Sequence, residues 1–461
     1  MSQVFKIRSV LLSATAAVVL SGCAATVDQG RSRADLSVAV GDRAGGDVSW
    51  QTAGGQDPAV AARIAQLSAA PLTVDGAVQL TLLAHPALQA RYAELGIAQA
   101  DLVEAGLVSN PVLDVSVRAT DALAVLEFGL IQNLLDVFTR AQRVKAADAA
   151  YRAATLSAAQ AAVAAAAETR RAYFELQGAK NVAAVMAEVR DAAETSWQLA
   201  ERFHAAGNIS DLELAEERAA FEDAVVELAE AELEVAAAER EFALAVGVVA
   251  PALQVSGTLP AAPETEPAAT GLEQTALDRR LDLAAARREV EAATAELKLA
   301  ADWRLWQELE AGAVVEREDD GEWIAGPEFA LALPLFNQGQ PAVARAAMAV
   351  LKAENEAKAV EAEIRAEVRE AAARVAALRG LVDRYRATIL PLKSEIVGLK
   401  QREYNFMLIG AFELLVAKRE EIETFRAYVA ALRDYWLARA DLVAATGGGT
   451  LAVPATTDAT P

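Results

Sequence analysis

The sequence predicts a mainly α-helical fold with a small β part, arranged as an internal tandem repeat. The stretch 139–203 is rich in alanine and free of proline, which favours one helix of roughly 95 Å at 1.5 Å per residue. A fixed spacing between similar residues indicates a repeated structural unit. That spacing is 201 residues here: Leu214, Phe221, Leu228, Val235 and Phe242 recur as Leu415, Ile422, Val429, Trp436 and Val443.

The N-terminal residues 1–22 have the form of an export signal. Lys6 and Arg8 precede an apolar run over 10–20, which is too short to span a bilayer comfortably. The small residues before Cys23 resemble the lipobox of bacterial lipoproteins, in which the cysteine is acylated and becomes the new N-terminus. Cys23 is therefore the predicted lipidation site, and Ala24 rather than Asp after it points to the outer membrane. The alternative is an ordinary secretory signal with an incidental cysteine.

Charge and cysteine content limit the classes of protein. Cys23 is the only cysteine, so an exported chain cannot form an internal disulfide. The formal net charge is −22, and it becomes −24 once the two positive charges of Lys6 and Arg8 are removed with the signal. Such an acidic chain without a basic stripe argues against a nucleic-acid partner.

Composition divides the remaining chain. Residues 23–70 are rich in Gly, Ala, Asp and Ser and are interpreted as a lipid-anchored tether. A proline-rich break over 248–271 separates two repeats. The predicted domains are a first repeat at 71–247, the linker at 248–271, a second repeat at 272–449 and a flexible tail at 450–461.

Each repeat contains a section with strand periodicity. Apolar and polar residues alternate over 111–118, and Leu126, Phe128 and Leu130 follow after a short turn, which predicts a β-hairpin over about 111–132. In the second repeat, 309–316 is expected to pair with Phe329, Leu331, Leu333 and Leu335 across an Asp-Gly turn, giving a hairpin over about 309–335.

Long helices fill the rest of each repeat. The counterpart of the first long helix covers 341–406, and Pro391 within it is expected to kink or break it. After Gly207, large residues recur every seven positions, with alanines three residues after four of them. This pattern predicts a left-handed supercoil with close helix packing. An ordinary amphipathic helix in a soluble bundle would explain the periodicity but not the length.

The number of predicted strands determines how many chains a closed barrel would need. Two hairpins supply four strands, whereas a transmembrane barrel needs at least about eight. Three chains would supply twelve, with apolar alternates facing lipid and polar alternates facing a lumen. If the strands cross a membrane, the chain must therefore oligomerise.

Several motifs in order resemble the TolC-type outer-membrane efflux proteins, particularly their lipidated branch. The resemblance covers about 75–449 and implies a trimer, in which a twelve-stranded outer-membrane barrel continues into a long α-helical periplasmic barrel. It also implies a periplasmic adaptor and an inner-membrane pump as partners. The motifs are His85-Pro86-Ala87-Leu88, Asn110-Pro111, Ala206-Gly207-Asn208, Leu333-Pro334-Leu335-Phe336-Asn337-Gln338-Gly339-Gln340, Tyr404-Asn405 and Gly410-Ala411-Phe412-Glu413-Leu414-Leu415.

Two groups of residues are candidates for function. Strand parity places a set of carboxylates toward the lumen, where an acidic lining would favour cations; alternatively, some of them lie in loops and are merely solvated. The resemblance suggests that the helical turns form the periplasmic tip, where carboxylates constrict the pore; alternatively, these are favourable charges near helix N-termini. The predicted pore lining is Asp114, Glu127, Glu308, Glu310, Glu316 and Glu328; the predicted tip and gate are Gly207, Asp211, Glu213, Gly410 and Glu413.

Catalysis has no support in the sequence. The two histidines, His85 and His204, lie far apart, and no phosphate-binding loop, metal-spaced cluster or nucleophile motif occurs. His204 is interpreted as a solvated surface residue. No cofactor, no metal site and no enzymatic activity are therefore expected.

The predicted protein is a lipid-anchored outer-membrane channel subunit with a large periplasmic portion. It would export small molecules or metal ions passively, with energy supplied by the pump. The alternative is a structural coiled-coil lipoprotein, a tether or adaptor that does not span the membrane. The hairpins between long helices separate the two, because adaptors usually carry a single helical hairpin flanked by β-rich modules.

Overall fold

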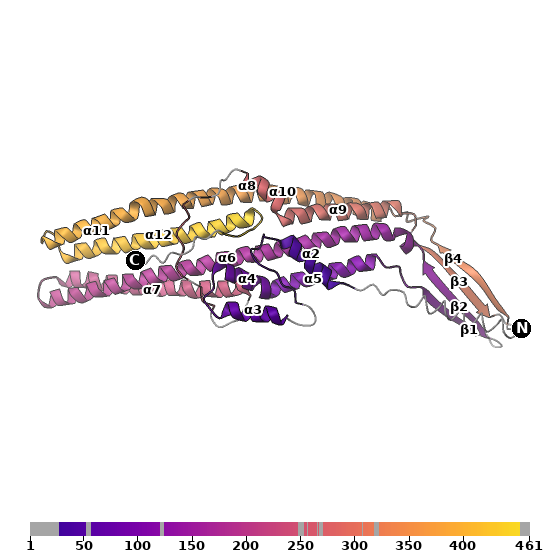
Figure 1. The fold of residues 1–461 in the computed structure, drawn as a ribbon, viewed down its shortest axis with the longest axis horizontal. Helices are drawn as coiled ribbons and strands as arrows, with labels where there is room; N and C mark the ends of the chain where they lie inside the picture. Colours follow the sequence, from indigo (N-terminus) through magenta and orange to yellow (C-terminus); the bar gives the residue numbers. More distant parts are fainter. Residues whose placement is uncertain are drawn as a thin grey trace. The chain divides into compact units, whose positions relative to one another are not determined.

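The computed structural model describes residues 27–51, 57–119, 124–247, 253–255, 257–264, 266, 271–306, 308–317 and 322–451 (Figure 1). The predicted signal, Cys23 and most of the predicted tail lie outside these residues, as do the turns of both hairpins. The chain forms two compact units. We call the first, over 1–32, 96–152 and 288–352, the strand unit, and the second, over 33–95, 153–287 and 353–461, the helical unit.

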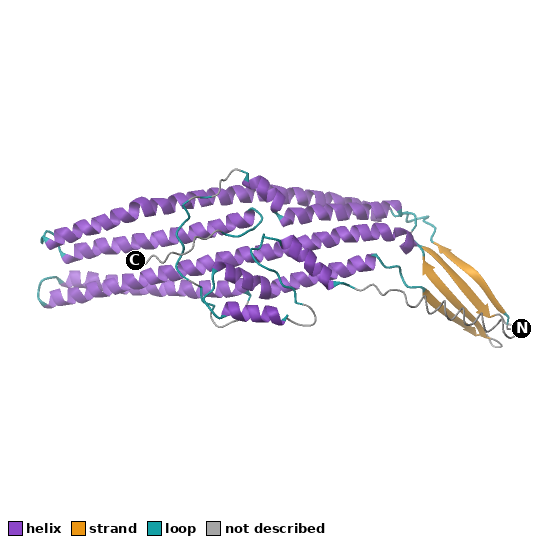
Figure 2. Ribbon diagram, in the orientation of Figure 1, coloured by secondary structure: helices purple, strands orange, loops and turns teal. Residues whose placement is uncertain are grey.

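The strand unit contains one four-stranded antiparallel sheet in the order β1-β2-β3-β4 (Figure 2). The hairpins predicted from alternation are thus confirmed as pairs, and β2 joins them by pairing with β3. The strands are β1 (Val112–Ala119), β2 (Ala124–Asn133), β3 (Leu309–Arg317) and β4 (Trp323–Leu331).

The second hairpin is shorter than predicted. Pairing ends with Leu309 opposite Leu331, so Leu333 and Leu335 lie beyond the strand, and the predicted pairing of these two residues was wrong. Pro334 between them has no N–H to donate to a ladder, which explains why the strand cannot continue.

Helices dominate the chain, which confirms the mainly α prediction. The longest, α6, runs for 71 residues without proline or internal glycine clusters to stop it. Among the described helices, none is both long and apolar enough to cross a bilayer. Besides α4 (Val74–Ala84), the α-helices of the two predicted repeats are α5 (Pro86–Ala105), α6 (Leu135–Ala205), α7 (Asp211–Val246), α8 (Leu272–Arg279), α9 (Leu281–Asp302), α10 (Gln340–Arg384), α11 (Leu390–Asn405) and α12 (Ala411–Ala445).

Pro391 perturbs its helix in a specific way. A five-residue π-helix, Tyr385–Ile389, separates α10 from α11 immediately before this proline. Proline lacks the N–H that would bond four residues back, and its ring crowds that carbonyl. The wider turn of a π-helix moves the carbonyl away, so the helix continues instead of ending.

Aromatic residues form the core of the helical unit. The Phe174 and Trp436 rings stack with centroids 5.2 Å apart, and both side chains are fully buried. The Trp436 indole donates to the carbonyl of Pro260 at 2.7 Å, which fixes part of the linker to the core. The alanines predicted to line the heptad seam of α7, Ala224, Ala231 and Ala238, are buried.

The N-terminal region departs from the sequence prediction. Residues 23–70, expected to be a tether with little regular structure, contain α2 (Gln29–Val40) and α3 (Pro58–Ser68), and α4 (Val74–Ala84) follows. Leu36 is fully buried. Asp57 caps α3 by accepting from the Ala59 amide, with Pro58 in the first turn, a helix-start pattern readable in the sequence.

A loop after α2 is fastened to the helical unit. The buried Arg170 side chain donates to the carbonyl of Ala44 at 2.9 Å, and the Gly449 amide donates to the carbonyl of Arg43 at 2.7 Å. Asp42 forms an ion pair with Arg279 at 3.1 Å, and hydrogen bonding to this guanidinium lowers the pKa of the Asp42 carboxyl. The loop is therefore part of the folded body.

Candidate functional site

The sheet has two chemically different faces. Residues directly opposite one another in an antiparallel pair project to the same face. Ser116 lies opposite Glu127, and Glu127 lies opposite Glu316. Counting along each strand by twos places five of the predicted pore-lining residues on this one acidic face. They are Asp114, Glu127, Glu310, Glu316 and Glu328.

The opposite face is apolar. Apart from Gln132 and Arg317 near strand ends, it carries only apolar side chains. Phe329 is 75% exposed and Val115 51% exposed, so this surface is uncovered in the single chain. A contiguous apolar surface of this kind is a contact surface for lipid or protein. Its large residues are Leu113, Val115, Val117, Leu126, Phe128, Leu130, Leu309, Val315, Trp323, Phe329 and Leu331.

One arginine lies among the acidic residues. The Arg118 guanidinium is 2.5 Å from a Glu127 carboxylate oxygen and 3.7 Å from one of Glu316. Ser116 donates its hydroxyl to Glu127 at 3.1 Å. Five carboxylates face one guanidinium, so the acidic face keeps an excess of negative charge. Glu308, also predicted to line the pore, precedes β3 and lies outside the sheet.

The first helical turn, between α6 and α7, depends on a glycine. Gly207 has φ of 75°, and the Asn208 and Gly207 amides donate to the carbonyls of Phe203 and His204. This is the Schellman arrangement, which requires a left-handed residue after the helix. An added Cβ at Gly207 would meet nothing within 4 Å, so backbone conformation alone favours glycine here.

The second turn, between α11 and α12, places a methionine in the equivalent position. Met407 has φ of 58°, and the Leu408 and Met407 amides donate to the carbonyls of Glu403 and Tyr404. Gly410 instead has φ of −78° and is the N-cap of α12, a conformation open to other residues. The two turns therefore match at a spacing of 200 residues, and the predicted constant spacing of 201 does not hold there.

The carboxylates of the turns make contacts that stabilise helix ends. Asp211, 98% exposed, lies 2.7 Å from the His204 ring, a pair that sequence reasoning missed when it assigned His204 to solvent. Glu213 and Ser210 form a reciprocal capping box, and the hydrogen bonds from Ser210 lower the pKa of Glu213. Glu413 lies 3.5 Å from Lys400.

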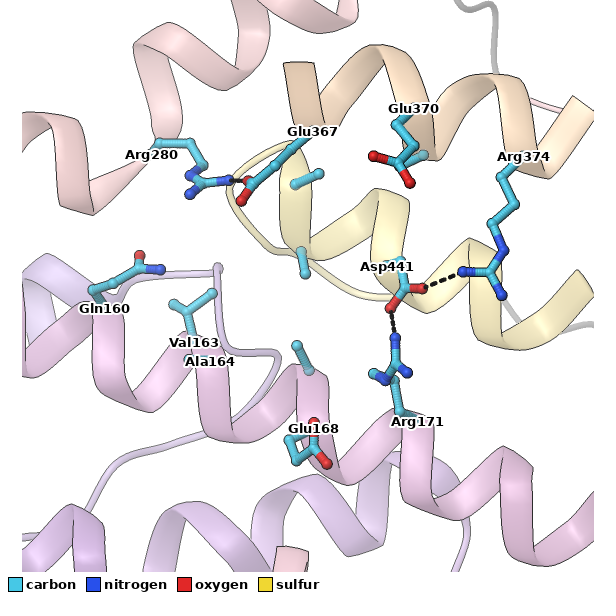
Figure 3. Close-up of a pocket in the computed structure, with 14 residues that line it drawn as sticks. Gln160, Val163, Ala164, Glu168, Arg171, Arg280, Glu367, Glu370, Arg374 and Asp441 are labelled. Atoms are coloured by element: carbon cyan, nitrogen blue, oxygen red, sulfur yellow. Dashed lines mark hydrogen bonds and ion pairs between the residues drawn. The ribbon is translucent and has the colours of Figure 1, made fainter. Parts of the chain in front are cut away.

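A charged pocket of about 390 Å³ lies within the helical unit (Figure 3). Asp441 of α12 bridges Arg171 of α6 and Arg374 of α10, the latter at 3.7 Å. Nearby, Arg280 contacts Glu367. The pair of Arg171 and Asp441 links the two predicted repeats, whereas the other two pairs lie within the second repeat. No sequence pattern indicated these pairs, because charges at helical spacing usually mark a solvated face. In the part of the chain that the structure describes, no group of three His, Cys, Asp or Glu residues could hold a metal ion.

Several solved structures have a fold similar to that of this chain. A crystal structure of a membrane protein from Pseudomonas aeruginosa has a TM-score of 0.70 at 20% identity, covering 84% of this chain and 92% of its own. The CmeC outer membrane channel of Campylobacter jejuni has a TM-score of 0.67 at 16% identity, covering 82% and 86%. The outer membrane protein VceC of Vibrio cholerae has a TM-score of 0.66 at 18% identity, covering 82% and 96%. These likenesses establish the fold.

Sequence comparison supplies the family. Curated protein sequences give no match to the chain. Residues 77–248 match the model of the family described as "Outer membrane efflux protein", and this segment includes β1, β2, α6 and α7. The resemblance predicted from the motifs is thus confirmed: this segment matches the outer-membrane efflux family, and the solved structures of similar fold include outer membrane channels.

Proposed function

We propose that three copies of this chain form the outer-membrane channel of a tripartite efflux system. The observation that carries the proposal is the sheet with one acidic and one apolar face. Four strands cannot close a barrel, and the outer backbone groups of β1 and β4 have no strand beside them in the described chain. Twelve strands from three chains would close one, with the apolar face toward lipid and the acidic face toward water.

The acidic face sets the proposed selectivity. Five carboxylates and one arginine per chain line the lumen in this assembly, and a ring of carboxylates attracts cations and repels anions. The cargo is therefore proposed to be small molecules or metal ions, moving passively through the pore. The chain itself performs no chemistry in this scheme.

The location and partners follow from the same proposal. Acylated Cys23 would hold the chain in the outer membrane, and the tandem repeats 71–247 and 272–449 would build the periplasmic wall. The matching hydrogen bonds of the turns at Gly207 and Met407 support this duplication. A periplasmic adaptor, linked to an inner-membrane pump, would bind the tip formed by these turns.

Asp211, Glu213 and Glu413 lie next to the turns and are proposed to narrow the pore at this tip. Each also has a local partner that stabilises a helix end, so the gating role needs a direct test. Single-channel conductance of Asp211→Asn should exceed that of the wild type. A conductance equal to the wild type would contradict a gating role for this carboxylate.

A low-resolution envelope of the detergent-purified protein tests the assembly. A channel should be a threefold hollow tube on the order of 130 to 140 Å long, with about 100 Å of helix and about 30 to 40 Å of membrane section. A solid monomeric rod would instead support the coiled-coil tether or adaptor. In planar bilayers, a reversal potential that shows anion preference would contradict the acidic lining.

A further inference from the structure

A second pocket lies in the strand unit, where the sheet meets the helices. Its volume is about 560 Å³, and it is lined by the start of α6, the end of α9 and the start of α10. β2 ends at Asn133 just before α6, and β4 ends at Leu331 before α10. We propose that this pocket binds the phosphate group of a membrane phospholipid.

The pocket concentrates positive charge in a chain whose net charge is −22. Arg143, Arg304 and Arg345 line it, and the one carboxylate among the lining residues is Asp136. Among the described residues, no carboxylate lies within salt-bridge distance of Arg304 or Arg345; Arg143 lies 3.5 Å from Asp136. Two guanidinium groups are therefore available to an incoming anion, and guanidinium geometry suits phosphate oxygens.

The Arg143 side chain supports the same reading. It donates to the carbonyl of Leu107 at 3.0 Å, which holds the guanidinium in place. Its Nε is buried and has no hydrogen-bond partner in the structure. A buried donor without a partner is costly, and a phosphate oxygen in the pocket would relieve that cost.

The backbone conformation at Gly339 brings two of the pocket arginines close together. Gly339, another lining residue, has φ of 79°, and an added Cβ there would approach the carbonyl of Arg304 to 2.7 Å. This close contact packs the start of α10 against the end of α9. It thereby directs Arg304, in the turn after α9, and Arg345 of α10 to one pocket.

Apolar side chains beside the pocket distinguish a phospholipid from a free phosphate ion. Phe138 next to the lining residues of α6 is 57% exposed and stacks on Trp303 with centroids 6.2 Å apart. Leu335 and Phe336, next to Asn337, are 70% and 97% exposed. Aromatic and basic residues together mark the headgroup level of membranes. The inference rests on the proposed function, because only a membrane-spanning sheet would put this pocket at headgroup level.

Lipid binding to delipidated full-length protein in detergent tests the proposal. Phosphatidylglycerol is added in mixed micelles and retention is counted by native mass spectrometry. The double variant Arg304→Gln/Arg345→Gln should bind about thirtyfold more weakly, since each basic residue near an anionic lipid contributes about fivefold. Arg384→Gln/Arg386→Gln makes the same charge change on exposed residues outside the strand unit and should bind like the wild type.

Additional variants and ligands in the same binding experiment identify the chemical group that is bound. Arg304→Lys/Arg345→Lys should retain most of the binding, which shows that loss in the glutamine variant reflects charge rather than misfolding. Equal lipid retention by the wild type and the glutamine variant would overturn the proposal. The proposal would also be overturned if diacylglycerol, which lacks the phosphate, bound as tightly as phosphatidylglycerol. It would be overturned as well if inorganic phosphate bound in an arginine-dependent way and phosphatidylglycerol did not bind.

The channel is tested separately from the pocket. Both double variants should conduct in planar bilayers, because none of the four arginines lies in the sheet. Wild-type protein that never conducts would contradict the proposed channel. The micelle titration would still report on the pocket, so the two failures can be told apart.

Discussion

Placing one arginine on each face of β1 gives a direct test of the two-faced sheet. Val115 and Ser116 are neighbours near the middle of this eight-residue strand and project to opposite faces. Val115 belongs to the apolar face and Ser116 to the acidic face. We predict that Val115→Arg blocks assembly in the membrane and that Ser116→Arg does not.

The magnitude follows from strand geometry. Eight residues at about 3.3 Å span about 26 Å, or about 20 Å across the membrane at a 40° tilt. Val115 is the fourth residue of the strand, so it would lie close to the bilayer midplane. An arginine facing lipid at that depth costs about 2–4 kcal/mol, and therefore about 6–12 kcal/mol over three copies. Arginine at position 116 would face lumenal water near Glu127 at little cost.

The assay is refolding into phospholipid vesicles over a denaturant series, with the resistant oligomer detected on gels without heating. The wild type and Ser116→Arg should give the oligomer in similar yield, and Val115→Arg should give little. Equal yields for both variants, or a larger loss with Ser116→Arg, would refute the assignment of faces. If the sheet were a soluble subdomain, both surface substitutions would change stability by only about 0.5 kcal/mol.

Three further outcomes are expected. Glu127→Gln/Glu316→Gln removes two of the acidic-face carboxylates, so the reversal potential under a salt gradient should move toward zero; no shift would argue against a lumenal position. Gly207→Ala should destabilise its turn by about 1 kcal/mol because alanine resists the left-handed region, whereas Met407→Gly should not, as judged by amide exchange of the flanking helix ends. Trp436→Phe replaces the indole with a smaller phenyl ring and removes the hydrogen bond to the linker, so denaturant unfolding should show a loss of about 1–3 kcal/mol; an unchanged midpoint would show that neither the bond nor the lost ring volume contributes.

Local patterns were enough to predict the main elements. Alternation over 111–118 predicted β1, and the alanine-rich stretch 139–203 predicted α6 to within a few residues at each end. The same alternation assigned five carboxylates to one face, since side-chain direction follows strand parity directly. Pro391 correctly indicated a perturbed helix, because a π-helix over Tyr385–Ile389 precedes this proline.

Other features depend on partners distant in sequence. The bridge from Arg171 to Asp441 joins residues 270 positions apart, and nothing local distinguishes them from solvated charges. The equivalence of Met407 with Gly207 was hidden because a methionine rarely takes a left-handed conformation, so the nearby Gly410 seemed the better candidate. The helix α3 was missed although Asp57-Pro58 is a recognisable start, because the composition around it suggested a linker.

The open sheet has a consequence for the life of a newly exported chain. Before it meets other copies, the chain presents two strand edges, β1 and β4, that have no neighbouring strand among the described residues, together with an exposed apolar face. Unprotected edges and apolar faces pair indiscriminately, and they are the usual start of aggregation. Escort by a chaperone during transit, and the local concentration of copies at the membrane, should therefore limit the yield of working protein more than the stability of its helices does.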